Sequence, residues 1–159
     1  MARRGFSVKV EGLRDLEKAL GDLPKANAKR VLTKTLKEAG EPVARTARAL
    51  APKDKLHLSE GIDVTTKLSP RQRRLNKKES PVEMYIGPGP DPAAHLDEFG
   101  TGDRITEDGR NLGSMPAQPF MRPAWDQHKM GVLDTIANRT WWEIEQAARR
   151  LAKKAAKGR

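Results

Sequence analysis

The stretch from His95 to Trp125 constrains the fold more than any other part of the chain. It contains three prolines, Pro116, Pro119 and Pro123, and four glycines. Each proline fixes φ and removes a backbone donor, so no regular helix or central strand is expected to run through them. Aromatic side chains in such a segment usually anchor a loop to a surface, and this stretch holds Phe99, Phe120 and Trp125. That surface belongs either to the same chain or to a neighbour.

The composition indicates one domain with a lean core. The chain has 159 residues, of which 36% are hydrophobic and 33% charged, so we treat residues 1–159 as a single domain. There is no cysteine, which excludes disulfides, thiolate metal sites and cysteine nucleophiles. No apolar run is long enough to cross a membrane, and the N-terminus lacks the apolar segment of a signal peptide.

Positive charge is concentrated in two places. The net charge is +10, which favours a polyanionic partner, either nucleic acid or an acidic protein surface, over a merely solvated face. One cluster is the set Arg71, Arg73, Arg74, Lys77 and Lys78. The other lies at the C-terminus, in and before a basic tail at residues 152–159, and consists of Arg149, Arg150, Lys153, Lys154, Lys157 and Arg159. Neither cluster has interleaved aromatics, so sequence-specific or single-strand recognition is not expected.

The N-terminal half predicts one strand and two helices. Residues 6–10 alternate apolar and polar, as in a half-buried strand. Leu13, Leu16 and Leu20 then follow helical spacing up to Gly21. A long helix is expected from residue 24 to residue 50 with an apolar stripe of Leu32, Leu36, Ala39, Val43, Ala47 and Leu50. Proline inside a helix costs on the order of 3 kcal/mol, so Gly40 and Pro42 predict a kink or break near Glu38.

Two strands and a basic arm are expected in the middle of the chain. After a loop at residues 51–60, residues 61–68 and 81–87 alternate as strands do, which predicts an antiparallel hairpin. Residues 68–80 between them would form a long, mobile, basic arm. A solvated tip and a tip that reaches DNA or a neighbouring molecule are equally compatible with this pattern.

The C-terminal half predicts a short helix, a mobile loop and a long helix. Residues 93–99 suit a helix that Asp91 could cap and that Gly100 would end. Residues 101–115 are polar and are expected to be mobile unless a partner orders them. A long amphipathic helix follows Pro123; because Trp141 and Trp142 are adjacent in it, one should enter the core and the other should meet another element or chain. The expected class is α+β, a small antiparallel sheet with a long hairpin arm packed against two long helices, plus short helices.

Catalytic and metal-binding patterns are weak. The histidines are His57, His95 and His128. His95 has Asp97 and Glu98 nearby, but the spacing matches no metal site. On a short helix, both acids would lie on different faces from His95. A small hydrolase built on these residues is a remote alternative. No cofactor is expected.

Four segments together carry a resemblance to a known family. They are Gly12-Leu-Arg-Asp-Leu-Glu-Lys-Ala-Leu20, the Ala47-Arg-Ala-Leu-Ala-Pro52 turn followed by Leu58-Ser-Glu-Gly-Ile62, Leu96-Asp-Glu-Phe-Gly-Thr101, and Met115-Pro-Ala-Gln-Pro-Phe-Met-Arg-Pro-Ala124. In this order the chain resembles the tail-component family of lambdoid, long-tailed bacteriophages, whose members act as tail-completion or neck proteins. The resemblance extends over roughly residues 12–148.

The resemblance implies a structural protein of the virion without catalytic activity. It implies a homo-oligomeric ring, expected to have six subunits, that completes or terminates the tail at the head–tail junction. The implied partners are the head connector or stopper protein, the tail tube protein and, within the channel, duplex DNA. The implied location is the neck of the virion, reached from the host cytoplasm during assembly. The main alternative function, suggested by charge alone, is a non-specific nucleic-acid-binding module.

A ring contact joins two different patches of each subunit, and the central stretch offers candidates for both. One is Glu98, Phe99, Gly100 and Thr101; the other is Pro119, Phe120, Arg122 and Pro123, with Trp142 as a further contact. Packing within the chain is the competing interpretation for Phe99, Phe120 and Trp125. The basic cluster at residues 71–78 would contact either DNA or an acidic neighbouring ring.

Overall fold

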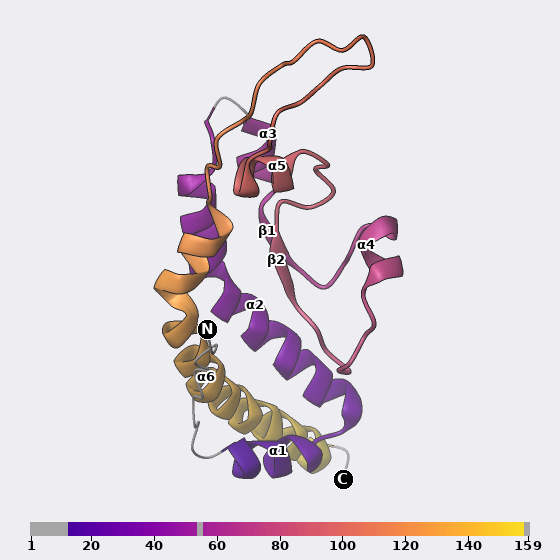
Figure 1. Cartoon of the computed structure of the whole chain (residues 1–159). Helices are drawn as coiled ribbons and strands as arrows, with labels where there is room; N and C mark the ends of the chain where they lie inside the picture. The colour runs from indigo at the N-terminus through magenta and orange to yellow at the C-terminus, as the bar shows by residue number, and fades with distance from the viewer. Residues whose placement is uncertain (1–12, 54–55, 158–159) are drawn as a thin grey trace, which may run out of the picture.

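The computed structural model describes residues 13–53 and 56–157, so the strand expected at residues 6–10 lies outside the described residues. The described elements are α1 (Leu13–Gly21), α2 (Lys25–Leu50), α3 (Leu56–Gly61), β1 (Asp63–Thr65), α4 (Pro70–Leu75), β2 (Tyr85–Gly87), α5 (Ala94–Phe99) and α6 (Met121–Lys157). Figure 1 shows two long helices, α2 and α6, side by side, with the smaller elements gathered around α2. No described helix is both long and apolar enough to cross a bilayer.

The two long helices run antiparallel. Lys34 pairs with Glu143, Glu38 with Arg139 and Thr46 with His128, so position falls along α6 as it rises along α2. Helix α6 has 37 residues and is therefore roughly 55 Å long. Helix α1 lies across the far end of the pair in Figure 1 and closes a small apolar cluster there, formed by Leu16, Leu23, Val31, Ile144 and Ala147.

The main core lies at the other end of the pair, where α2 and α6 meet the sheet and the short helices. Leu58, Ile62 and Phe120 are its large, fully buried side chains. Small residues line the helix contact, among them Ala39, Ala44, Ala47 and Ala124. Small side chains allow the helix axes to approach closely, so the core is narrow.

Helix α2 is unbroken from Lys25 to Leu50, with Pro42 inside it. The predicted break near Glu38 is therefore wrong, although the course of the helix bends along its length in Figure 1. Gly40 explains the tolerance: it is buried, and a Cβ there would lie 2.9 Å from Val64 Cγ1 and 3.1 Å from Ile86 Cδ1. The glycine admits the sheet onto the helix, and this packing offsets the cost of the proline.

The buried face of α2 is rotated relative to the predicted stripe. Its buried residues include Val31, Thr35, Ala39, Val43 and Ala47, each four positions after the last. Leu50, the end of the predicted stripe, is exposed. A polar residue, Thr35, therefore occupies a core position that apolar periodicity does not reveal.

The sheet is antiparallel, as predicted, but shorter than the predicted strands. Val64 pairs with Ile86, flanked by the pairs of Asp63 with Gly87 and Thr65 with Tyr85. Both strands pack on α2, with Val64 buried and Ile86 packed against the core. The class is thus broadly α+β, mostly helical with a small two-stranded sheet.

Two short helices lie where loops were expected. Helix α3 falls within the predicted loop at residues 51–60, and its fully buried Leu58 packs it into the core. Helix α4 lies within the predicted basic arm. Its N-terminus carries a capping box, because the side chains of Ser69 and Gln72 each accept the other residue's backbone N–H. The segment at residues 68–80 therefore contains regular structure, while its mobility stays a prediction.

Candidate subunit interface

Glu98 ties α5 to the start of α6. Its Oε2 atom accepts backbone N–H groups from Phe120 at 2.8 Å and Met121 at 2.9 Å, and its Oε1 atom accepts the N–H of Arg122 at 3.0 Å. These are the donors that a helix N-terminus leaves without intrahelical partners. A carboxylate there also interacts favourably with the helix dipole. Glu98 is thus the cap of α6, supplied by a different helix.

The hydrogen bonds decide the charge state of Glu98. Burial acts to raise the pKa of this carboxyl, but the backbone N–H groups of Met121, Phe120 and Arg122, together with the Arg122 charge, hold the pKa below its ordinary value. The group is therefore ionised at neutral pH, and the cap carries a full negative charge.

Gly100 ends α5 and permits a close crossing of the chain. Its φ is +69°, a value that favours glycine. A Cβ there would lie 2.7 Å from the Met115 carbonyl oxygen and 2.8 Å from the Ala117 nitrogen. Thr101 N donates to the Met115 carbonyl at 2.9 Å, and Met115 N donates to Thr101 Oγ1 at 3.1 Å. The two ends of the following segment are thereby fastened together.

Residues 101–115 form a hairpin, which we call the arm from here on; it is distinct from the predicted basic arm at residues 68–80. Further backbone hydrogen bonds join Leu112 N to the Arg104 carbonyl at 2.7 Å and Thr106 N to the Arg110 carbonyl at 2.9 Å. Figure 1 shows the arm, drawn in orange, projecting past α3 and α5. Nearly all of its residues are exposed, including the apolar Ile105 (70%) and Leu112 (59%). The segment predicted to be mobile unless a partner orders it is therefore a hydrogen-bonded hairpin that leaves the body of the molecule, and its mobility stays a prediction.

An open apolar groove lies beside the base of the arm. It has a volume of about 780 Å³ and lies between the end of the sheet, α5 and the first turns of α6. Met84 and Ile86 line it from the sheet side, and Phe99 and Trp125 line it from the helices. Phe99 is 67% exposed and Trp125 47% exposed. This exposed apolar surface makes the groove a candidate contact site for a partner.

The basic cluster lies on the surface. Arg71, Arg73 and Arg74 belong to α4, while Lys77 and Lys78 follow it, and all five are exposed. Asn76 donates to the Tyr85 hydroxyl at 2.9 Å, and that hydroxyl donates to Glu83. With the N–H groups of Ser80 and Glu79, the Tyr85 hydroxyl lowers the pKa of Glu83 to about 2. These contacts fold the segment back toward the sheet.

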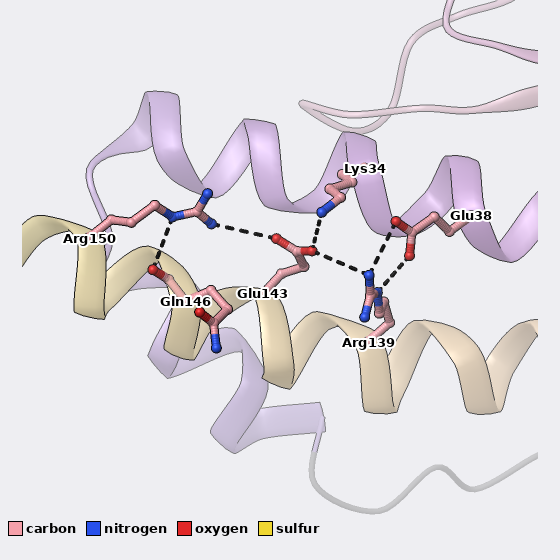
Figure 2. A network of polar contacts seen from close by, with 6 residues as sticks. All are labelled: Lys34, Glu38, Arg139, Glu143, Gln146 and Arg150. Atoms are coloured by element: carbon pink, nitrogen blue, oxygen red, sulfur yellow. Dashed lines mark hydrogen bonds and ion pairs between the residues drawn. The ribbon is translucent and has the colours of Figure 1, made fainter.

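A network of charges joins the two long helices far from the arm (Figure 2). Glu143 is buried, and it is approached by Lys34 Nζ at 2.5 Å, Arg150 Nη2 at 3.7 Å and Arg139 Nη2 at 3.8 Å. Arg139 also pairs with Glu38 at 2.6 Å. The buried carboxylate is compensated by Lys34 of α2 and by Arg139 and Arg150 of α6, and removing these partners would leave a buried charge without compensation.

Trp142 belongs to this network. The Arg139 guanidinium lies 4.2 Å from its ring centroid and the Lys34 ammonium 5.7 Å from it, within the range of cation–π attraction. Trp141 and Trp142 are 39% and 44% exposed. The prediction that one of the two enters the core is therefore wrong, because the core position of this turn is taken by Thr140 and Ile144.

The histidines have separate roles. His57 lies 3.3 Å from Asp91, His128 lies 2.7 Å from Thr46 Oγ1, and His95 is exposed on α5. Both carboxylate oxygens of Glu98 accept backbone N–H groups at the start of α6, so this carboxylate is not placed to work with His95 as the hydrolase alternative requires. Within the described residues, no group of three or more His, Cys, Asp or Glu side chains is placed to hold a metal ion.

The comparison with family models decides the relationship. A model described as "Bacteriophage HK97-gp10, putative tail-component" matches residues 14–100, which is more than half of the chain. The chain belongs to this tail-component family. It is accordingly a structural, virion-associated protein of a bacteriophage tail, as its resemblance to the family implied. No curated protein and no solved structure matches the chain.

The family match ends at Gly100, so it covers α1 to α5 and leaves out the arm and α6. Three of the four segments that suggested the family fall within it, apart from residues 12, 13 and 101 at its edges. The fourth, residues 115–124, lies outside. In this tail component the fourth segment is joined to the matched region by Glu98, whose carboxylate caps α6.

The predicted interface residues divide into three groups. Glu98 and Phe120 are buried within the chain, at 8% and 1% exposure, so their side chains are not a contact surface, and packing within the chain is the correct interpretation for Phe120. Gly100 and Thr101 hold the base of the arm. The remaining predicted residues are all exposed, namely Phe99, Pro119, Arg122, Pro123 and Trp142, and their role in an interface stays a prediction.

Sequence reasoning missed Glu98, which has no local signal, and other residues that do have one. The capping role of Glu98 depends on donors 22 to 24 residues away. Glu143 could have been noticed, because it is an acid next to Ile144 on the apolar face of its helix. The apolar side chains of the arm could also have been noticed, since Ile105 and Leu112 interrupt an otherwise polar segment.

Proposed function

We propose that this tail component forms a closed ring of identical subunits, six in number, at the head–tail junction. The observation that carries the proposal is the exposed apolar surface around Phe99 and Trp125, next to the arm. A lone subunit would leave this surface in water, whereas assembly would bury it. The arm and the groove are unlike surfaces on one chain, as a head-to-tail ring contact requires.

In this proposal the ring completes or terminates the tail. One face would bind the head connector or stopper protein and the other the tail tube protein, with duplex DNA passing through the channel. The exposed basic cluster on and after α4 supports contact with a polyanion or an acidic neighbouring ring, because its five cations are concentrated on one short segment.

The proposal is tested by changing one exposed side chain at a time. Phe99→Ser removes the most exposed aromatic of the groove, so we expect a soluble monomer by size-exclusion chromatography. Particles assembled with this variant should show separated heads and tails in electron micrographs. Leu50→Ser is the matched control, since Leu50 is 47% exposed but does not line the groove. Normal rings and joined particles with Phe99→Ser would refute the proposal.

A second function, non-specific DNA binding, is favoured by the basic cluster. Phosphate contacts weaken as salt rises, because binding releases condensed counterions. If the cluster contacts DNA, filter retention of duplex DNA should fall steeply with salt, and Arg73→Gln with Arg74→Gln should reduce the salt dependence. If no duplex DNA is retained even at low salt, the basic cluster does not bind DNA, and an acidic neighbouring ring is its proposed contact.

A further inference from the structure

We propose that the arm of one subunit docks in the apolar groove of the next, with Ile105 and Leu112 as its apolar contacts. The inference rests on the proposed ring and specifies its contact. It names one occupant of the groove, a second copy of this chain.

The arm cannot serve its own groove. The hydrogen bonds between Thr101 and Met115 fasten its base, and the Arg104 to Leu112 bond continues the hairpin outward. The arm has about seven residues on each side and so extends roughly 20 Å from its base. Ile105 and Leu112 remain mostly exposed, at 70% and 59%, so the described chain leaves most of their apolar surface uncovered.

The charges of the two surfaces are complementary. Glu107 and Asp108 are exposed at the tip of the arm, where Asp108 lies 3.6 Å from Arg110. Its three acids (Asp103, Glu107 and Asp108) outnumber its two arginines (Arg104 and Arg110), so the arm carries one net negative charge. The groove holds two acids, but Glu98 is buried with both oxygens bonded to backbone N–H groups, and Asp91 is mostly covered and pairs with His57. The exposed charges at the groove are cationic: Arg122 lines it, and Arg71 lies on the adjoining α4 wall.

The base of the arm is joined to the same helices that line the groove. Glu98 fixes α5 to α6, and both helices line the groove, while Gly100 at the end of α5 begins the arm. A fixed angle between the inserting segment and the receiving groove is what a head-to-tail contact needs to close into a ring rather than extend as a filament.

The absence of cysteine makes a direct test possible. One population carries Ile105→Cys and the other Trp125→Cys; the two are mixed, oxidised and analysed by non-reducing electrophoresis and mass spectrometry. We expect a mixed disulfide, because a disulfide requires Cα atoms within about 7 Å. Met130→Cys is the matched control, since Met130 lies on α6 with 48% exposure, against 47% for Trp125, and does not line the groove.

A charge exchange adds an independent measurement. Glu107→Arg with Asp108→Arg should weaken assembly by about tenfold, as should Arg71→Glu with Arg122→Glu, and combining all four should restore most of it. Rings seen by electron microscopy without the Ile105–Trp125 cross-link, or with equal cross-linking to Met130 or between two Ile105→Cys copies, would overturn this inference alone. No assembly of the unmodified protein would overturn the proposed ring and, with it, this contact.

Discussion

At the scale of single residues, Glu98 has the most consequences, because it caps a 37-residue helix from another element. Glu98→Gln keeps the shape but removes the charge and turns one acceptor into a donor facing backbone N–H groups. We expect the free energy of unfolding to fall by roughly 1–3 kcal/mol. Urea denaturation followed by circular dichroism measures this. Glu145 is an exposed acid on α6, the helix that Glu98 caps, and Glu145→Gln should change the stability little.

The same residue predicts a pH dependence. The folded-state pKa of Glu98 is lowered, so the folded state holds the ionised form more strongly than the unfolded state does. Its contribution to stability is therefore fully present above the unfolded pKa of about 4.3 and is lost as pH falls through the folded pKa. The stability difference between the unmodified protein and Glu98→Gln should shrink below about pH 4.5. A difference that stays constant through this range would contradict the assignment.

Thr35 and Thr140 are fully buried, and neither hydroxyl has a hydrogen-bond partner among the described residues. A buried hydroxyl without a partner is costly, so Thr35→Val should raise the unfolding free energy by about 1 kcal/mol. Thr33→Val is the control, because the Thr33 hydroxyl donates to the Lys29 carbonyl at 2.8 Å. Thermal denaturation of both variants checks the order; equal effects would show that burial of the hydroxyl is not the cause.

For single residues, the sequence predicts properties that follow from residue type better than contacts with distant parts of the chain. The exposure of Arg71 to Lys78 and the glycine turn at Gly100 follow from residue type and are confirmed. The burial of Phe120 and the cap formed by Glu98 do not follow, because each depends on a partner more than twenty residues away. Tertiary partners, rather than local propensity, decide which residues of the central stretch face water.

At the scale of elements, two helical glycines should respond in opposite directions. Gly40→Ala places a Cβ 2.9 Å from Val64 Cγ1, and overpacking of this kind costs roughly 1–3 kcal/mol. Gly131 lies in α6 with no atom within 4 Å of the added Cβ, so Gly131→Ala should stabilise by about 0.5–1 kcal/mol. Chemical denaturation of the pair measures both. A stabilising Gly40→Ala would show that the sheet does not pack on α2 as described.

The elements that periodicity predicted are the long or strongly amphipathic ones. Helices α1, α2 and α6 are confirmed, with α6 starting at Met121, two residues before Pro123, because proline is tolerated in a first helical turn. The break in α2 is wrong because packing through Gly40 outweighs the local cost of Pro42. Helices α3 and α4 were missed because six residues are too few to show a helical period. Helix α5 has the same length but was predicted, because Gly100 marks its end.

At the scale of the whole molecule, the chain combines a narrow core with surfaces that suit a partner. The apolar residues of the central stretch divide between these two tasks: Phe120 fills the core, while Phe99 and Trp125 remain exposed beside an arm that leaves the body of the protein. Membership of a tail-component family fits these exposed apolar surfaces, because a component of a phage tail has neighbouring proteins.

The oligomeric state of the purified protein tests the central claim most directly. Negative-stain electron microscopy, combined with light scattering on the same sample, should show closed rings of six copies with a central channel. In the proposed ring, apolar contacts in the groove drive assembly, so the rings should persist as salt rises, whereas contacts made by exposed charges weaken. A monodisperse monomer at the concentrations used for microscopy would contradict the account.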